Sequence, residues 1–317
     1  MRFYAVLWAC ALWTVLGSGD RRASCAHFLT SKKPSKDEHH AVSSLKHALL
    51  RQVKDMAQAV SESKGADVAA MVQVGAHLGN MNPGDPYGRL TLEAKMRTIL
   101  VEPQPHVYGR LVQHIEDQGI SRIKVLNAAV CEEAKAGSNV TFYSISPKVD
   151  PASGRVEGGR GFPLWASQIA SLNKEHIMKH APWIPNVQDY IVEIQVPCTS
   201  VRAILENYRI PPSDLLVLSI DAEGYDLKIL SSIDLSVNKP LLLVFETIHV
   251  DLHEVAATLR NLTGLHGYHC FRDRENAYLY GGEGGWGGDW TNFSAVVQGE
   301  FAKYCVGSTC RQQYDFY

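Results

Sequence analysis

Four residues able to take part in proton transfer lie directly after two strongly hydrophobic runs. Asp221 and Glu223 follow the first run, and Glu246 and His249 follow the second. Carboxylates and imidazoles can accept a proton from a hydroxyl group, and carboxylates can also hold a divalent ion such as Mg²⁺. Capping of the next helix would explain Asp221 or Glu223 singly, but it explains Glu246 and His249 less well. We therefore expect catalysis here, with a metal ion as an open alternative.

A second group of residues has the spacing of a nucleoside-binding loop. Gly75 and Gly79 follow an earlier apolar run, and Glu102 ends the next one. Glycine lets the backbone turn tightly against a ligand, and an acid at the second strand end can accept bonds from both ribose hydroxyls. The third glycine that a pyrophosphate needs is missing. The spacing favours S-adenosylmethionine over NAD, with an ordinary turn and a solvated acid as the alternatives.

Strands and helices alternate along the part of the chain that must position these residues. The alternation predicts a doubly wound, Rossmann-like α/β sheet that is mostly parallel. Residues 140–145 and 190–196 predict an antiparallel hairpin that encloses an insertion at 146–189, and antiparallel strands follow from Tyr268 onward. The expected strands are 69–74, 98–101, 124–130, 215–220 and 241–245, and the expected helices are 104–118, 200–208, 224–232 and 251–262.

The N-terminal residues have the pattern of a secretory signal. Arg2 precedes an apolar run at 3–16, and small residues follow at 17–19. The run is shorter than the roughly 20 residues of a spanning helix, so a cleaved signal is expected and an uncleaved signal-anchor is the alternative. The expected organisation is a signal at 1–19, a linker at 20–40, a docking helix at 41–64, a main domain at 65–300 and a tail at 301–317.

Cysteine usage suits an oxidising compartment. Of seven cysteines, Cys10 lies in the signal, and the remaining even number is typical of disulfides. We expect Cys305 and Cys310 to pair, whereas Cys131 and Cys198 could equally be buried free thiols. Three asparagines have the pattern of glycosylation acceptors, namely Asn139, Asn261 and Asn292.

Overall charge and composition exclude some partners. The 317 residues carry a formal net charge of −2, whereas a general nucleic-acid binder is usually strongly basic. No later apolar run is comparable to the first. We therefore expect no nucleic-acid partner, and no stable membrane insertion unless the signal stays uncleaved.

Five short motifs, in their order and spacing, resemble those of the FkbM family of methyltransferases. They are Val-Gly-Ala-x-x-Gly at 74–79, Val-Glu-Pro-x-Pro at 101–105, Asn-Ala-Ala-Val at 127–130, Ile-Asp-x-Glu-Gly-Tyr-Asp at 220–226 and Val-Phe-Glu at 244–246. The resemblance covers roughly residues 69–250. It implies a class I methyltransferase fold that transfers a methyl group from S-adenosylmethionine to a hydroxyl.

The resemblance also implies roles for individual residues. Glu102 would hold the ribose of the cofactor, and Asn127 and Ala128 would lie near its adenine. Gln73 stands where many members have aspartate, which puts recognition of the cofactor's amino group in question, and His77 replaces a commoner asparagine. The implied cofactor-binding set is Gln73, Gly75, Ala76, Gly79, Glu102, Asn127, Ala128 and Asp221.

These observations together predict an S-adenosylmethionine-dependent O-methyltransferase of the secretory pathway. Its acceptor would be a hydroxyl of a carbohydrate, a glycoconjugate or a small molecule. A dinucleotide-dependent oxidoreductase would need more phosphate-binding glycine than is present. A non-catalytic secreted module that keeps the fold is a further alternative, favoured by Gln73 and by a compartment into which S-adenosylmethionine must be imported. A plastid address through a bipartite leader would relieve that supply problem.

Overall fold

The computed structural model describes residues 25–26, 36–65, 68–79, 86–150, 162–273 and 275–281. The expected signal at 1–19, the expected pair Cys305–Cys310 and the acceptor Asn292 lie outside these residues. Within the described ranges, no helix combines the length and the apolar character that crossing a membrane requires.

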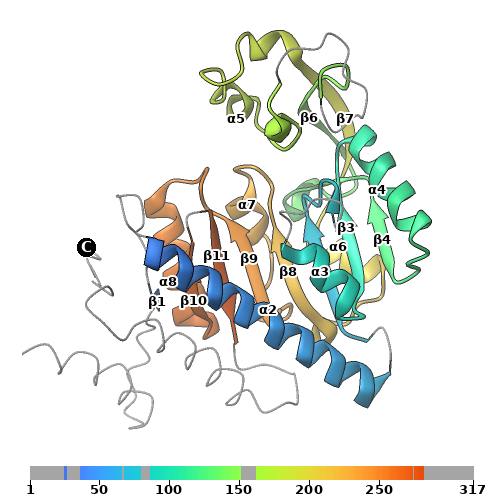
Figure 1. Ribbon diagram of the computed structural model, residues 1–317, viewed down its shortest axis with the longest axis vertical. Coiled ribbons are helices and arrows are strands. Elements are labelled where there is room, and N and C mark those ends of the chain that lie inside the picture. The colour runs from blue at the N-terminus through green and yellow to red at the C-terminus, as the bar shows by residue number, and fades with distance from the viewer. Residues whose placement is uncertain are drawn as a thin grey trace, which may run out of the picture.

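An eight-stranded sheet forms the centre of the protein (Figure 1), in the order β1-β10-β11-β9-β8-β2-β3-β4. Strand β11 pairs antiparallel with both of its neighbours, and the other pairings in this sheet are parallel. The predicted doubly wound, mostly parallel sheet with antiparallel C-terminal pairing is confirmed. Its strands are β1 (Cys25–Ala26), β2 (Ala70–Val74), β3 (Arg97–Val101), β4 (Ile123–Leu126), β8 (Leu215–Ile220), β9 (Leu242–Glu246), β10 (His269–Arg272) and β11 (Asn276–Tyr280).

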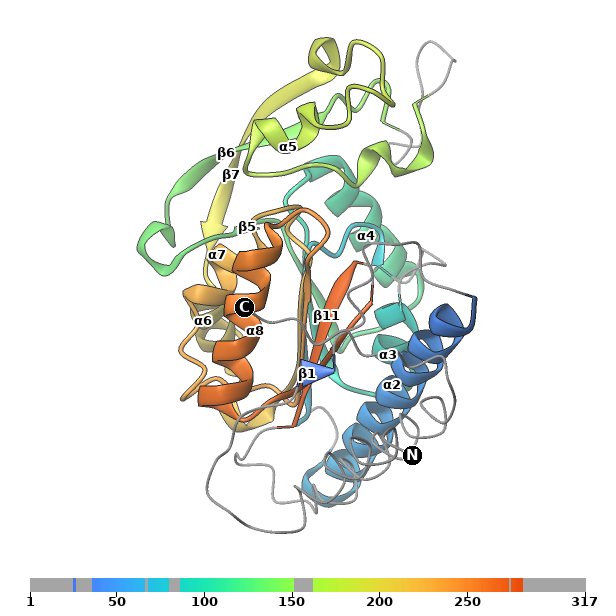
Figure 2. The ribbon, with the colours of Figure 1, turned by 90° about the vertical axis from the view of Figure 1, so that its left-hand side faces the viewer.

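Helices cover both faces of this sheet (Figure 2). One layer contains α2 (Lys36–Lys64), α3 (Pro86–Glu93) and α4 (Pro105–Asp117), and the other contains α6 (Val201–Asn207), α7 (Asp226–Ser231) and α8 (Leu252–His266). Helix α2 begins at Lys36, within the expected linker, and α3 was not expected from the sequence.

Strand periodicity explains the two-sided core. Successive side chains of β2 point to opposite faces, so Val72 packs with the layer of α6, α7 and α8, whereas Met71 packs with α2 and α3. Every residue of β8 is buried, which is the reason that its run is apolar at every position except Ser219. Leu45, Leu49 and Val53 bury one stripe of α2 against the sheet, as the helical spacing predicts.

The predicted antiparallel hairpin is present as β6 (Asn139–Ile145) and β7 (Ile191–Thr199), and the segment it encloses contains α5 (Lys174–Met178). This insertion stands over the edge of the central sheet where the parallel strands end (Figures 1 and 2). It has a small core of its own, which includes Ile145, Ile177, Ile184 and Val187.

The single strand expected at 124–130 is wrong, because the chain divides there into two strands. Strand β4 ends at Leu126, and β5 (Ala129–Val130) pairs with β7 in a second sheet, which has three strands in the order β5-β7-β6. Between them, the Asn127 amide donates hydrogen bonds to the carbonyl oxygens of Glu102, at 2.8 Å, and Pro103, at 3.1 Å. These bonds hold the chain where it leaves one sheet for the other.

Candidate active site

A cavity of 430 Å³ lies at the carboxyl ends of β2, β3, β8 and β9. Parallel strands bring their carboxyl ends to one edge of a sheet, and ligands of open α/β sheets bind there. The insertion forms part of the wall through Trp165, Gln168, Ile169, Ala170 and Leu172. The cavity is therefore enclosed by strand ends on one side and by the insertion on the other.

The turn after β2 requires glycine at its first position. Gly75 has a φ of +72°, and a Cβ built there would lie 1.8 Å from the carbonyl oxygen of Asp221. Gly79 also has a positive φ, and its Cβ would meet Leu111 at 3.0 Å. Because a Cβ at position 75 would overlap backbone at the β8 end, Gly75 lets the β2 and β8 ends approach each other beside the cavity.

Glu102 closes β3 and lines the cavity, although only 2% of its surface is exposed. Its two carboxylate oxygens accept backbone N–H groups, from His77 at 2.8 Å and from Gln104 at 2.8 Å. Burial raises the pKa of Glu102 to about 7, and the two backbone hydrogen bonds oppose that shift. A carboxylate has about four lone-pair sites, so sites remain for two hydroxyl donors.

The other residues of the implied cofactor-binding set divide into two groups. Gln73, Ala76 and Ala128 are buried residues that line the cavity. Asn127 is not among the lining residues, and its amide instead holds the loop after β3. The structure therefore gives Asn127 a positioning role next to Glu102.

His77 connects the glycine turn to the insertion. Its φ of +46° is a left-handed conformation, which asparagine and histidine adopt more readily than most residues. Its Nε2 atom lies 3.1 Å from Oγ of Ser167 in the insertion. Burial lowers the pKa of His77 to about 4, so the ring is neutral at physiological pH.

The turn after β8 brings two acids to the same cavity. Asp221 and Glu223 both line it, and Glu223 adopts a left-handed φ of +51°. The alternative that Asp221 or Glu223 caps α7 (Asp226–Ser231) is wrong, because the N-cap residue is Tyr225 and no side chain makes a capping hydrogen bond there. The fully buried Asp226 carboxylate accepts the N–H groups of Ala222 and Gly224, each at 3.1 Å. Capping of α7 therefore does not account for Asp221 and Glu223.

Two histidines that sequence analysis passed over, His176 and His180, form a cluster with His249. Of these, His176 lies beside Glu223. His176 Nε2 lies 2.9 Å from Oε2 of Glu223, and His249 Nε2 lies 3.5 Å from the same oxygen. His249 Nε2 is also 3.8 Å from Oε1 of Glu246. The structure thus brings together three of the four predicted catalytic residues with two residues of the insertion. The spacing His-x-x-x-His at 176–180 was a signal in the sequence that could have indicated them.

Burial is the largest cause of the pKa shifts in this cluster. Burial raises the pKa of Glu246 to about 10, and the charge of Asp221 adds to the shift. Burial also raises the pKa of Glu223 well above its usual range, again with Asp221 contributing. Burial lowers the pKa of His176 to about 3 and that of His249 to about 4. Each of these groups is thus driven towards its neutral form.

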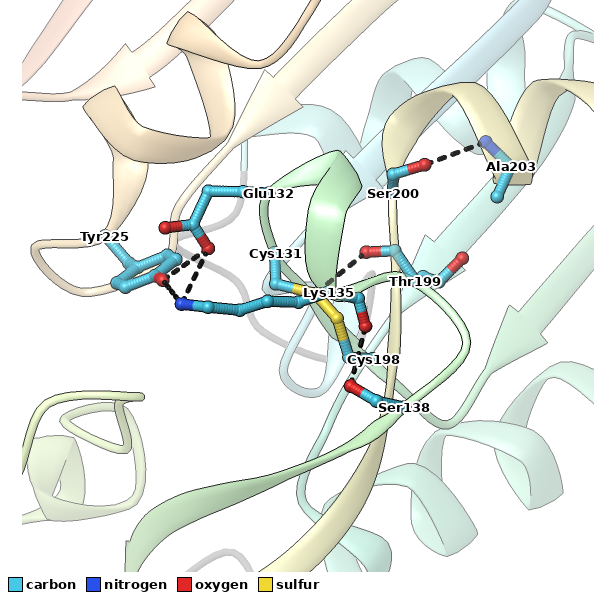
Figure 3. The surroundings of a disulfide bond; sticks show 9 residues. All are labelled: Cys131, Glu132, Lys135, Ser138, Cys198, Thr199, Ser200, Ala203 and Tyr225. Atoms are coloured by element: carbon cyan, nitrogen blue, oxygen red, sulfur yellow. Dashed lines mark hydrogen bonds and ion pairs between the residues drawn. A yellow bond between two sulfur atoms is a disulfide. The ribbon is translucent and has the colours of Figure 1, made fainter.

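A disulfide closes the base of the insertion (Figure 3). Cys131 and Cys198 are bonded to each other, so the interpretation of these two as free thiols is wrong. Next to the bond, the Tyr225 hydroxyl donates to Glu132 at 2.6 Å, and Lys135 donates to Tyr225 at 3.0 Å. These contacts connect the base of the hairpin to the turn that carries Glu223. Cys270 is also disulfide-bonded.

The sequence matches the family described as "Methyltransferase FkbM domain" over residues 73–269. Among solved structures, methyltransferase FkbM from Methylobacillus flagellatus KT is similar, at 14% identity and a TM-score of 0.38 over 68% of this chain and 44% of that chain. The chain therefore spans less than half the length of that protein. Precorrin-6y C5,15-methyltransferase from Geobacter metallireducens GS-15 is similar at 13% identity and a TM-score of 0.30, over 80% of this chain and 91% of that chain. No curated protein sequence matches the chain.

Proposed function

The chain belongs to the FkbM family of methyltransferase domains, and from this premise we propose that it uses S-adenosylmethionine to methylate a hydroxyl group. The observation that carries the proposal is the position of Glu102. Its buried carboxylate lines the cavity at the tip of β3, where an acid in nucleoside-binding folds accepts the ribose hydroxyls.

The residues around the cavity fit this cofactor. Gly75 lies too close to the carbonyl of Asp221 for a Cβ to fit, and as a glycine it lines the cavity without a side chain. Gln73 and Ala128 supply a polar and an apolar buried surface on either side of Glu102. A volume of 430 Å³ lies in the range of small-molecule sites.

Asp221 is the residue we propose as the general base. When bound, S-adenosylmethionine supplies an electrophilic methyl group, and the electrons of its carbon–sulfur bond stay with sulfur. The acceptor oxygen forms the new bond to carbon and must lose its proton. Asp221 is exposed and faces the cavity, so its carboxylate can accept that proton. Holding the acceptor in line with the methyl group supplies much of the remaining rate.

A sugar hydroxyl is the acceptor class that the cavity wall favours. Trp165 lines the cavity and stays 36% exposed, and Trp183 of the same insertion is 66% exposed. Flat aromatic faces of this kind combine a large apolar contact area with little loss of side-chain entropy, and they suit the apolar face of a sugar ring. A carbohydrate or glycoconjugate is therefore the acceptor we propose.

The secretory pathway is the compartment we propose. The disulfide between Cys131 and Cys198 suits an oxidising lumen. Asn139 and Asn261, which have the pattern of glycosylation sites, are both exposed. Mass mapping of the protein from its native cells should show the Cys131–Cys198 peptide and a glycan on at least one asparagine. The cross-linked peptide without any glycan would favour a plastid, and free thiols at both positions would contradict both compartments.

Calorimetry of the purified full chain tests the central proposal. We expect saturable binding of S-adenosylmethionine with one site and no binding of NAD. Transfer of labelled methyl from S-adenosylmethionine to sugars and glycans then tests the acceptor. Absence of cofactor binding by the folded protein would favour the non-catalytic module. Binding without transfer to any hydroxyl acceptor would leave the cofactor site in place and contradict O-methylation.

A further inference from the structure

Five potential metal ligands converge from three separate segments of the chain. His176 and His180 come from the insertion, Glu223 from the turn after β8, and Glu246 and His249 from the end of β9. They form two triads that share His249. The first triad is His176, His180 and His249, and the second is Glu223, Glu246 and His249. Within each triad, one ligand atom per residue lies within 4.8 Å of the others.

The distances in this cluster are those of a coordination shell. Zinc binds imidazole nitrogen and carboxylate oxygen at 2.0–2.2 Å with tetrahedral geometry, which places neighbouring ligand atoms about 3.4 Å apart. The separations found here are 2.9 Å between His176 Nε2 and Glu223 Oε2, 3.5 Å between His249 Nε2 and Glu223 Oε2, and 3.8 Å between His249 Nε2 and Glu246 Oε1. They bracket the expected value.

Buried atoms of the cluster lack the hydrogen bonds that would otherwise stabilise them. The side chain of His176 is 2% exposed, and neither of its ring nitrogens has a hydrogen-bond partner. The same is true of Nε2 of His180 and of Oε2 of Glu223 and Glu246. Buried polar groups in folded proteins are nearly always satisfied, so a cluster of such atoms facing one another needs an explanation.

A simple ion pair between His176 and Glu223 explains the cluster less well. It would use one ring nitrogen of His176 and leave the other without a partner. A cation between the rings and the carboxylates would neutralise both buried glutamates and use the orphaned atoms.

We propose that His176, His249, Glu223 and Glu246, with His180 adjacent, bind a divalent first-row transition ion such as Zn²⁺. Imidazole-rich donor sets suit zinc and its neighbours, whereas Mg²⁺ prefers oxygen ligands and water. The histidines therefore change the expectation from a magnesium site to a zinc-type site.

The proposed site has a structural consequence. Because His176 belongs to the insertion, the ion would fasten the insertion to the ends of β8 and β9. Glu223, Glu246 and His249 also line the cavity, so the ion would lie in its wall. Four protein ligands in tetrahedral geometry leave no open position on the ion, so, if the proposed methyl transfer holds, its role there is to keep the insertion in place over the cavity.

Metal binding to the purified full chain tests this proposal without any measurement of turnover. The protein is freed of metal with a chelator and titrated with Zn²⁺ or Mg²⁺ in a calorimeter. We expect one equivalent of Zn²⁺ to bind and Mg²⁺ to give no saturable signal. His176→Ala and His249→Ala should each weaken Zn²⁺ binding by at least about 100-fold, because loss of an outer-shell partner alone costs 10–100-fold. His253→Ala removes an exposed histidine of α8 and should change nothing.

Cobalt supplies a second measurement in case the variants fail to fold. Co²⁺ bound to the wild-type chain should show the intense visible absorption of a tetrahedral nitrogen and oxygen site, and Zn²⁺ should displace it. Absence of Zn²⁺ binding, Zn²⁺ binding that the two histidine variants leave unchanged, or an octahedral Co²⁺ spectrum would each overturn the proposal. S-adenosylmethionine affinity measured in the chelator reports on the cofactor site alone, so failure of the metal site is distinguishable from failure of the proposed function.

Discussion

Replacement of Glu102 is the sharpest perturbation of the proposed cofactor site. Glu102→Ala removes the carboxylate whose remaining lone pairs face the cavity. Hydrogen bonds to a charged group contribute about 1.5–3 kcal/mol, which corresponds to an increase of about 10- to 150-fold in the Kd for S-adenosylmethionine. Glu116→Ala removes an exposed glutamate of α4 and should leave the Kd unchanged.

The same substitution affects folding, because Glu102 also accepts the N–H groups of His77 and Gln104. A buried donor left without its acceptor costs about 1–3 kcal/mol, so Glu102→Ala should lower the melting temperature. Binding must therefore be measured well below the melting transition, with circular dichroism confirming the fold. A Kd within about twofold of the wild-type value in the folded variant would refute the assignment of Glu102 to the ribose.

The pH dependence of binding gives an independent check on Glu102. Its pKa is about 7 in the ligand-free protein, and hydroxyl donors stabilise its charged form. Cofactor binding should therefore release a proton below about pH 7, and the Kd should rise roughly tenfold between pH 8 and pH 6. In Glu102→Gln this dependence should disappear, because no proton can be released. Calorimetry in buffers of different ionisation enthalpy measures the released proton, and its absence in the wild-type protein near pH 6 would contradict the reasoning.

The raised pKa of Glu102 also makes the free energy of unfolding depend on pH. A carboxyl whose pKa rises on folding from 4.5 to about 7 contributes stability that is fully present below about pH 4.5. That contribution is lost as the pH rises through about 7, because the charged form is more costly in the folded protein.

Three further perturbations follow from the geometry of the site. Gly75→Ala should abolish cofactor binding or folding, because its Cβ would overlap the Asp221 carbonyl, whereas Gly119→Ala has the same left-handed strain but open space and should cost only modest stability in melting curves. Asp221→Asn should lower turnover by about 10²–10⁴ with little change in the Kd for S-adenosylmethionine, and normal turnover would remove this residue from the mechanism. Replacing Cys131 and Cys198 by serine should cost about 4 kcal/mol in urea unfolding, since the disulfide closes a separation of 67 residues, and a loss below about 1 kcal/mol would contradict its structural role.

The central sheet could be predicted because its signals are local. The run at 215–220 is apolar except at Ser219, and β8 has these same bounds. The glycine at 75 and the acids at 102 and 221 follow such runs directly, so their positions at one edge follow from the parallel order of the strands. The division of the run at 124–130 could not be predicted, since it depends on hydrogen bonds from Asn127 to a loop distant in the sequence.

The acceptor side of the site could not be predicted in the same way. The insertion at 146–189 has no sustained period, so its sequence does not indicate how it folds back over the strand ends. Its position depends on long-range contacts such as Ser171 donating to the carbonyl of Glu223 at 2.9 Å, and Gln104 donating to the carbonyl of Ser167 at 3.0 Å. The sequence therefore did not indicate that His176 lies next to Glu223.

The sequence predicts the strand ends that border the cavity but not the position of the insertion, and this affects the choice of general base. Glu223, Glu246 and His249 were considered equally with Asp221 while only the strand ends were known. With His176 placed 2.9 Å from Glu223, those three residues belong to the proposed metal cluster, and an ion there would use the lone pairs that a base needs. Asp221 belongs to neither triad and faces the cavity. It is therefore the group that can accept the acceptor's proton whether or not the cluster holds an ion, and the two proposals can be tested separately for that reason.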